Sequence, residues 1–230
     1  FNATPQLIQF CEKYCQYVDE GYTDVIHVPI NRSGSSTYNN AVMAQGMLRE
    51  ERPEHHLNIH LLDPHTYSMV FGWYLCEMAR KLQNGAELRH VISEFETQMN
   101  KMEVILGPYS LKQMKKSGRI SAAAAVMGEL MGIRPIITLI DGKTRVESKV
   151  RGDDKVIPAM IDLCKKRTEG VEDFDYMIGH TSIPQAAELE KACRKAFGKA
   201  PLTTFNLGGV VSANTGPDTL ALIYVGKARD

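Results

Sequence analysis

The chain has 230 residues, of which 43% are hydrophobic and 23% are charged, as in an ordinary globular protein. Lys plus Arg number 27 and Asp plus Glu number 27, so the net charge is zero and argues against a general nucleic-acid-binding protein. Five cysteines without a CxxC pair indicate reduced thiols in a cytoplasmic protein. The sequence contains neither a signal peptide nor a run of about 18 apolar residues, so we expect no membrane span.

The first half of the chain alternates predicted helices with predicted strands. Apolar residues at helical spacing predict helices over 5–21, 37–51, 67–85 and 87–102. Short apolar runs predict strands over 24–30 and 57–63. Such alternation is typical of a parallel α/β sheet.

The second half predicts a mixed sheet. An Asp-Gly turn at 141–142 predicts a hairpin between strands over 134–140 and 145–150. We expect a loop and a helix over 107–121, and further helices over 122–132, 152–170 and 184–198. Strands are expected over 175–182, 202–208 and 219–226, and a connector at 209–218 joins the last two of them. The overall expectation is an α/β protein with two lobes, residues 1–105 and 106–230.

The segment 31–41 reads NRSGSSTYNNA and lies between a predicted strand and a predicted helix. This position favours an anion, because unpaired N–H groups and the helix dipole face the ligand at the carboxyl edge of the sheet. Ser33, Ser35, Ser36 and Thr37 would add hydroxyl donors. The alternative is that these hydroxyls only cap the helix. The segment has neither the spacing of a Walker A loop nor a GxGxxG motif.

Two further residues each admit two interpretations. His180 follows a predicted strand and either faces a cleft or bonds its own loop. With Ser35 or Ser36 it could also support nucleophilic catalysis, although the GxSxG motif is missing. Arg119 either binds a carboxylate or phosphate, or forms a structural ion pair.

Basic residues and histidines each cluster at one place in the sequence. Lys149 and Arg151 form either a solvated face or a docking patch for an acidic partner. His55–His56 and His60 could suggest a metal site, but the first two resemble a solvated loop and the third belongs to a predicted strand. We therefore expect no metal.

Several segments, in order along the whole chain, match the motifs of one known family. INRSGSSTYNNA is similar to ISSxLSGTYxxA, and LLDPHTYSMVFG resembles VxDSxSxSxGxG. The most specific match is LKQMKKSGRISAAAAVMGELMGIRPIITLIDGKT, and IGHTSIPQAAEL and GGVVSANTGPDTLAL match the last two blocks. The chain thus resembles the DegV family of bacterial fatty-acid-binding proteins, which includes the acyl-carrier subunit of fatty acid kinase.

The resemblance implies a DegV-like fold with the ligand between two lobes. A long-chain fatty acid would place its acyl chain in an apolar tunnel and its carboxylate on Ser35, Ser36 and Thr37. His180 and Arg119 would line the side on which the carboxylate is phosphorylated.

The implied role is that of a cytoplasmic carrier without catalytic activity or cofactor. Its partner would be an ATP-dependent fatty acid kinase subunit, and peripheral membrane contact would be compatible with this role. Docking of that subunit at Lys149 and Arg151 is our hypothesis from the residues themselves. The alternative is a phosphoryl- or acyl-transfer enzyme of a related fold that acts on a small substrate.

The chain departs from the family pattern at several places. The usual N-terminal segment is missing and the chain opens at FNATPQL without an initiator Met, which indicates a fragment or a processed product. Asn2 and Ala3 stand where the family has Thr and Ser, and Thr4 could replace the lost carboxylate contact. Ser36 replaces a Gly and Asn214 replaces a His.

Overall fold

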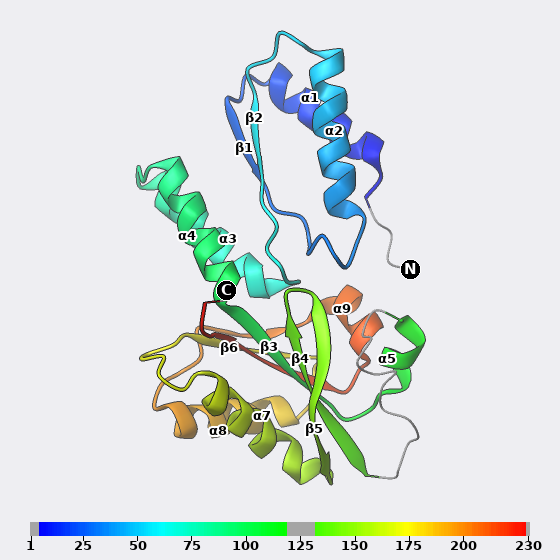
Figure 1. The fold of residues 1–230 in the computed structure, drawn as a ribbon, viewed down its shortest axis with the longest axis vertical. Coiled ribbons are helices and arrows are strands. Elements are labelled where there is room, and N and C mark those ends of the chain that lie inside the picture. Colours follow the sequence, from blue (N-terminus) through cyan, green and yellow to red (C-terminus); the bar gives the residue numbers. More distant parts are fainter. Residues whose placement is uncertain (1–4, 119–131, 229–230) are drawn as a thin grey trace. The chain divides into compact units, whose positions relative to one another are not determined.

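The computed structural model describes residues 5–118 and 132–228 (Figure 1). Asn2, Thr4, Arg119 and nearly all of the helix expected over 122–132 lie outside these described residues. The chain divides into two compact units, Phe1–Tyr67 and Ser68–Asp230. The division expected between residues 105 and 106 instead falls inside strand β3 (Met102–Pro108), which hydrogen-bonds to strands on both sides within the second unit.

The first unit is a β-α-β arrangement preceded by a helix. Its elements are α1 (Leu7–Asp19), β1 (Asp24–His27), α2 (Thr37–Glu51) and β2 (Asn58–Leu61). β1 and β2 pair in parallel, with Asp24 opposite Asn58 and His27 opposite Leu61. The helices and strands enclose a small apolar core that contains Cys11, Tyr14, Ala44, Leu48 and Leu57.

A histidine at the end of β1 makes this unit sensitive to acid. His27 Nδ1 lies 2.6 Å from the Tyr14 hydroxyl, the Phe10 ring packs against the imidazole, and burial lowers the pKa of His27. The imidazole of a histidine in the unfolded chain has a pKa of about 6.5, so below that pH the unfolded chain binds a proton at this histidine more readily than the folded chain does. Stability is therefore complete above about pH 6.5 and falls on acidification. Urea unfolding from pH 8 to 5 should show this slope, and His27→Gln should reduce it; an equal slope in the variant would contradict the assignment.

The second unit begins with two helices, α3 (Met69–Gln83) and α4 (Leu88–Lys101), which lie side by side (Figure 1). The turn between them uses Gly85 in the left-handed region, at φ +84. The Glu87 carboxylate then caps α4 by accepting hydrogen bonds from the backbone N–H groups of Arg89 and His90, at 3.0 and 2.9 Å.

A mixed sheet of six strands forms the centre of the second unit, in the order β5-β4-β3-β8-β6-β7. The remaining strands are β4 (Ile133–Ile140), β5 (Lys143–Arg151), β6 (Tyr176–His180), β7 (Thr204–Asn206) and β8 (Thr219–Val225). Among the described strands of this sheet, only β6 and β7 pair in parallel. The predicted hairpin is confirmed, because Asp141 and Gly142 both adopt positive φ between β4 and β5. The predicted α/β class, with a parallel first sheet and a mixed second sheet, is likewise confirmed.

Two elements of this unit differ from the expectation. The sequence predicts a helix that ends at residue 102 and no element over 103–106, whereas β3 begins directly after α4 and is buried along its full length. The connector expected at 209–218 instead contains most of the helix α9 (Gly208–Thr215), whose first residue, Gly208, has a φ of +79. The expected helices are present as α5 (Lys112–Ser117), α7 (Val156–Arg167) and α8 (Gln185–Phe197).

The sheet buries apolar side chains on both faces. Ile105, Leu222 and Ile178 lie in register on neighbouring strands and pack in one cluster with residues of α7 and α8. Side chains alternate along a strand, so Val104 and Ile223 face the opposite side, where they are also buried. Helix α7 approaches closely enough that a Cβ on Gly107 of β3 would lie 2.4 Å from the sulfur of Met160.

A buried ion pair connects α7 to the middle of the sheet. Glu103 of β3 accepts hydrogen bonds from Arg167 Nε at 2.5 Å and Nη2 at 3.2 Å, and from the Tyr224 hydroxyl at 2.6 Å. The hydrogen bond with Glu103 raises the pKa of Arg167, while burial and then the charge of Glu103 raise the pKa of Tyr224. The guanidinium therefore stays charged and the phenol stays protonated.

Candidate functional site

Two loops follow the parallel strands of the first unit, one over residues 28–36 after β1 and one over 62–67 after β2. Both leave the carboxyl ends of their strands, which is the usual position of ligand sites in parallel sheets. Hydrogen bonds join the loops: Asn31 N–H donates to the Thr66 carbonyl at 3.1 Å, and Arg32 N–H donates to Asp63 Oδ1 at 3.4 Å. The two loops therefore form one polar edge.

The structure brings two of the predicted hydroxyls together at the start of α2. Ser35 Oγ and Thr37 Oγ1 lie 2.8 Å apart, and Ser35 Oγ also accepts the Thr37 N–H at 3.2 Å. Ser36 occupies the N-cap position without a side-chain capping bond, so Ser35 supplies the capping hydroxyl. The Ser35–Thr37 pair shares one hydrogen internally, which leaves one hydroxyl hydrogen that can be donated to a ligand.

Sequence reasoning overlooked Asn31, which stands at the base of the same loop. Its side chain is 1% exposed, and its Oδ1 accepts both the N–H and the hydroxyl of Ser33, at 2.7 and 2.6 Å. These two bonds determine the orientation of the amide and leave Nδ2 without a hydrogen-bond partner among the described residues. An Asn two residues before a Ser, directly after the strand predicted over 24–30, was the signal for this turn.

The second loop contributes a buried hydroxyl and a neutralised carboxylate. Thr66 is 3% exposed, and its Oγ1 has no partner in the described part of the chain. Asp63 pairs with Arg32, at 3.2 Å between Oδ2 and Nε, and accepts the His65 N–H at 2.9 Å. The negative charge of this loop is therefore already compensated by a cation.

Tyr67 packs directly against the Ser-rich loop. A Cβ added to Gly34 would lie 1.8 Å from the Tyr67 hydroxyl oxygen, so the tyrosine occupies the space that a side chain at residue 34 would need. Burial, and then the charge of Asp63, raise the pKa of Tyr67, which keeps the phenol protonated and able to donate. No motif indicated this contact, because it depends on the fold of both loops.

His180 lies in the second unit at the end of β6. Its Nδ1 accepts the Ser182 N–H at 3.0 Å, and its carbonyl accepts the Leu207 N–H at 2.8 Å. Of the two interpretations of this residue, the bond to its own loop is therefore observed. In the neutral imidazole the acceptor role of Nδ1 places the hydrogen on Nε2, which can donate to another group.

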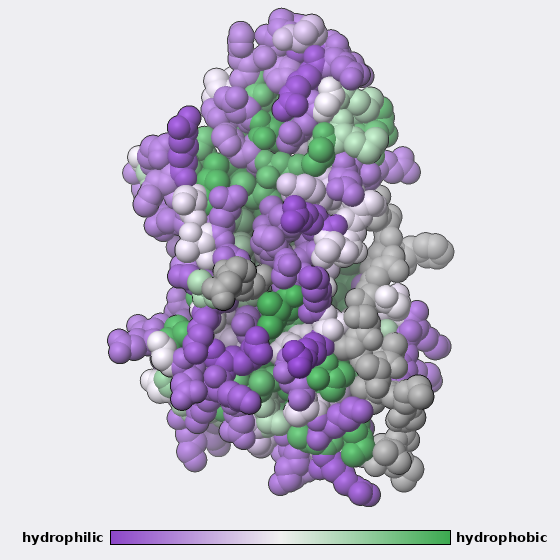
Figure 2. Space-filling view, viewed as in Figure 1, coloured by the Kyte–Doolittle hydropathy of each residue, from purple (hydrophilic) through white to green (hydrophobic). Residues whose placement is uncertain are grey.

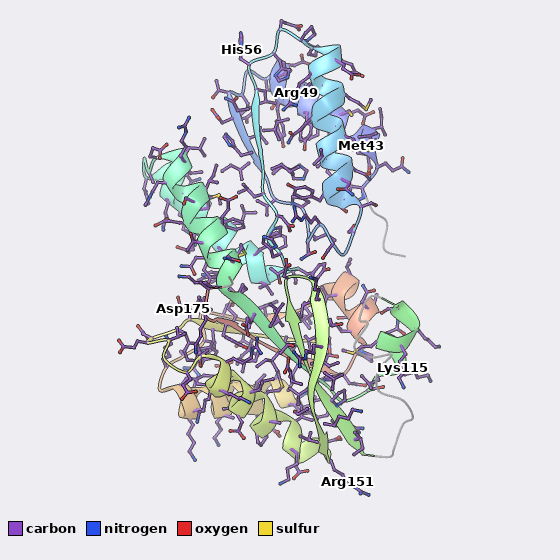
Figure 3. The ribbon with its side chains drawn as sticks, in the orientation of Figure 1. Met43, Arg49, His56, Lys115, Arg151 and Asp175 are labelled. Carbon is purple, nitrogen blue, oxygen red and sulfur yellow. The ribbon has the colours of Figure 1, made fainter. Side chains whose placement is uncertain are left out.

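Lys149 and Arg151 are both exposed on β5, the edge strand of the larger sheet. Arg151 is labelled in Figure 3. They stand opposite Pro135 and Ile133 of β4 and point to the same side, because they are two residues apart on one strand. This geometry suits either a solvated edge or a docking surface.

In the described part of the chain no helix is long and apolar enough to cross a membrane. Figure 2 shows hydrophilic residues over most of the visible face, with apolar residues dispersed among them. No three side chains of His, Cys, Asp or Glu within the described ranges are grouped so as to hold a metal ion.

Comparison with known proteins identifies the family, since the DegV family model matches residues 3–227. The chain belongs to the DegV family. A DegV domain-containing protein of Staphylococcus aureus (strain COL) is 28% identical over 231 residues, which cover 98% of this chain and 77% of the relative. A DegV domain-containing protein of Clostridium acetobutylicum is 26% identical over 224 residues, which cover 97% of this chain and 77% of the relative. The predicted family resemblance is confirmed.

Solved structures of DegV proteins share the fold. A fatty-acid-binding DegV family protein of Streptococcus agalactiae is 26% identical, with a TM-score of 0.83 over 98% of this chain and 78% of that protein. A stearic-acid-binding protein of Eubacterium ventriosum is 20% identical, with a TM-score of 0.85 over 98% of this chain and 78% of that protein. At 20% identity the second likeness bears on the fold alone.

The departures from the DegV motifs have local explanations. Ser36, where the family has Gly, adopts φ −70 and ψ −3, so the replacement causes no backbone strain. Gly34 stands where the motif has Leu, and Tyr67 fills the vacated space. Asn214, where the family has His, directs its amide to the Val210 carbonyl of its own helix at 2.9 Å.

Proposed function

We propose that this DegV protein binds a long-chain fatty acid and acts as a cytoplasmic carrier without catalytic activity of its own. The observation that carries the proposal is the Ser35–Thr37 hydroxyl pair, which begins α2 at the carboxyl edge of the parallel strands. The DegV family protein of Streptococcus agalactiae is described as binding fatty acids, which supports the same ligand class here.

The carboxylate would bind at the start of α2. Ser35 is the principal donor of this proposal, with Thr37 and Ser36 or their N–H groups beside it, and the helix dipole favours the negative charge. Each CH₂ of the acyl chain would contribute about 0.8 kcal/mol on burial, so most of the affinity comes from apolar contact. Asn2, Thr4, Arg119 and His180 are proposed as further ligands of the head group.

Native mass spectrometry of the purified protein, followed by lipid extraction, tests this proposal. A stoichiometric fatty acid, or uptake of added oleate or palmitate, is the expected result. Ser35→Ala should weaken palmitate binding about tenfold or more, because a hydrogen bond to a charged group is lost. Ser93→Ala, on the exposed face of α4, is the matched control and should bind like the parent. A parent protein that takes up no fatty acid would refute the proposal.

The carrier role requires a partner, which we propose to be an ATP-dependent fatty acid kinase subunit docked at the exposed Lys149 and Arg151. Reversing both charges (K149E/R151E) should weaken association with the kinase severalfold, with a larger loss at low salt because exposed charges are screened. Surface plasmon resonance at two salt concentrations measures this. Unchanged affinity would exclude the patch, and turnover of an acyl or phosphoryl substrate without a partner would favour an enzyme instead.

A further inference from the structure

Two buried polar groups beneath the Ser-rich loop have no hydrogen-bond partner among the described residues: Asn31 Nδ2 and Thr66 Oγ1. Both side chains are almost fully buried, at 1% and 3% exposure. An unsatisfied buried polar group costs about 1–3 kcal/mol, so two of them in one small unit need an explanation.

The two groups belong to one place in the fold. Asn31 N–H donates to the Thr66 carbonyl at 3.1 Å, which brings the residues together from the loops after β1 and β2. The Asn31 amide cannot be flipped without loss, because its Oδ1 already accepts two hydrogen bonds from Ser33. Nδ2 is therefore a donor, and the Thr66 hydroxyl can also donate.

The charges around this place permit an anion. The Asp63 carboxylate in the second loop is paired with Arg32 at 3.2 Å and bonded by the His65 N–H at 2.9 Å. Burial and the charge of Asp63 raise the pKa of Tyr67, so the neighbouring phenol is neutral. Asp63 Oδ2 has no hydrogen bond among the described residues, but its charge is paired with Arg32. The groups that remain without either kind of partner at this place are Asn31 Nδ2 and Thr66 Oγ1, and both can donate to an acceptor-only ligand group.

We infer that Asn31 Nδ2 and Thr66 Oγ1 donate hydrogen bonds to the carboxylate of the ligand and thereby select a fatty acid over the corresponding fatty alcohol. This inference rests on the proposed function and adds a second pair of donors to the Ser35–Thr37 pair. A carboxylate has only acceptor oxygens and can accept hydrogen bonds from all of these donors. An alcohol also carries a hydroxyl hydrogen that needs an acceptor, and Asn31 Nδ2 cannot accept it.

The test compares palmitate with hexadecanol on the full chain by isothermal titration calorimetry. Asn31→Asp keeps the Oδ1 acceptor for Ser33 and replaces the donor by a negative oxygen. Palmitate binding should fall about 100-fold, while hexadecanol, whose hydroxyl can donate to the new oxygen, should stay within about threefold of the parent. Thr66→Val should weaken palmitate about tenfold, and Thr66→Ser, which keeps the hydroxyl, should restore it.

An acid-to-alcohol preference that is unchanged in both Asn31→Asp and Thr66→Val overturns the inference, and a structural water bridging the two groups would give that result. Circular dichroism and thermal unfolding establish that the variants are folded.

Failure of the proposed function gives a different pattern, namely a parent that binds no palmitate. The inference is then tested by NMR spectroscopy of the Asn31 side-chain amide. Its resonances are identified as those that disappear in the Asn31→Asp variant. Shifts on titration with octanoate or inorganic phosphate support an anion at this place, and their absence overturns it.

Discussion

Replacing Glu103 by Leu is expected to lower the free energy of unfolding by about 3 kcal/mol. The substitution removes the acceptor of both Arg167 hydrogen bonds and of the Tyr224 hydroxyl bond. A largely buried guanidinium and a fully buried phenol are then left without a partner, and burial of an unpaired charge is costly. Urea denaturation at pH 7 measures the change.

We expect the loss of stability in Glu103→Leu to come from the unpaired charge of Arg167, and a second substitution tests this cause. Adding Arg167→Met to Glu103→Leu removes the orphaned cation and should recover most of the lost stability, because an apolar pair of similar volume packs as well as an ion pair. Tyr224→Phe removes only one bond to a charged group and should cost about 1.5–3 kcal/mol. A Glu103→Leu variant within about 0.5 kcal/mol of the parent would show that the network does not hold α7 to the sheet.

Local chemistry made several elements predictable. The β4–β5 hairpin follows from Asp141 and Gly142, whose positive φ values are the ones that an Asp-Gly turn favours. The β1–α2–β2 unit follows from alternation of apolar runs with helical spacing.

β3 escaped prediction because the signals that define it are not local. No Gly or Pro separates α4 from β3, so helical spacing leads directly into a strand of seven residues. The strand is specified by its partners, since Val104 pairs with Leu139 on one side and Ile223 on the other. Such pairing has no signature within the segment itself.

In the candidate site, too, some residues could be predicted from local sequence and others could not. Ser35 and Thr37 were recognisable because hydroxyls before a helix have a known local role. Asn31 and Thr66 were not, because their importance depends on burial and on a bond between two loops more than 30 residues apart in sequence. A sequence pattern names the groups that can bind, whereas only the fold shows which of them remain unpaired.

Replacing Gly34 by Ala is expected to destabilise the first unit by about 1–3 kcal/mol. The φ angle of Gly34 is not in the left-handed region, so Ala meets no backbone strain. Its Cβ would instead lie 1.8 Å from the Tyr67 hydroxyl oxygen and 2.8 Å from Cζ, so the ring must move. Gly46→Ala in α2 is the matched control: a Cβ there meets nothing within 4 Å, and Ala in a helix should stabilise by about 0.5–1 kcal/mol.

A double-mutant cycle separates steric overlap from other effects. Tyr67→Ala alone should destabilise through lost packing, but Gly34→Ala should cost little in its presence, because the space is then free. Additive losses would show that residues 34 and 67 do not compete for this space. The cycle also reports on the ligand site, since Tyr67 directly follows Thr66. A displaced ring should shift Thr66 and weaken palmitate binding in Gly34→Ala, and binding equal to that of Gly46→Ala would separate the packing of Tyr67 from carboxylate recognition.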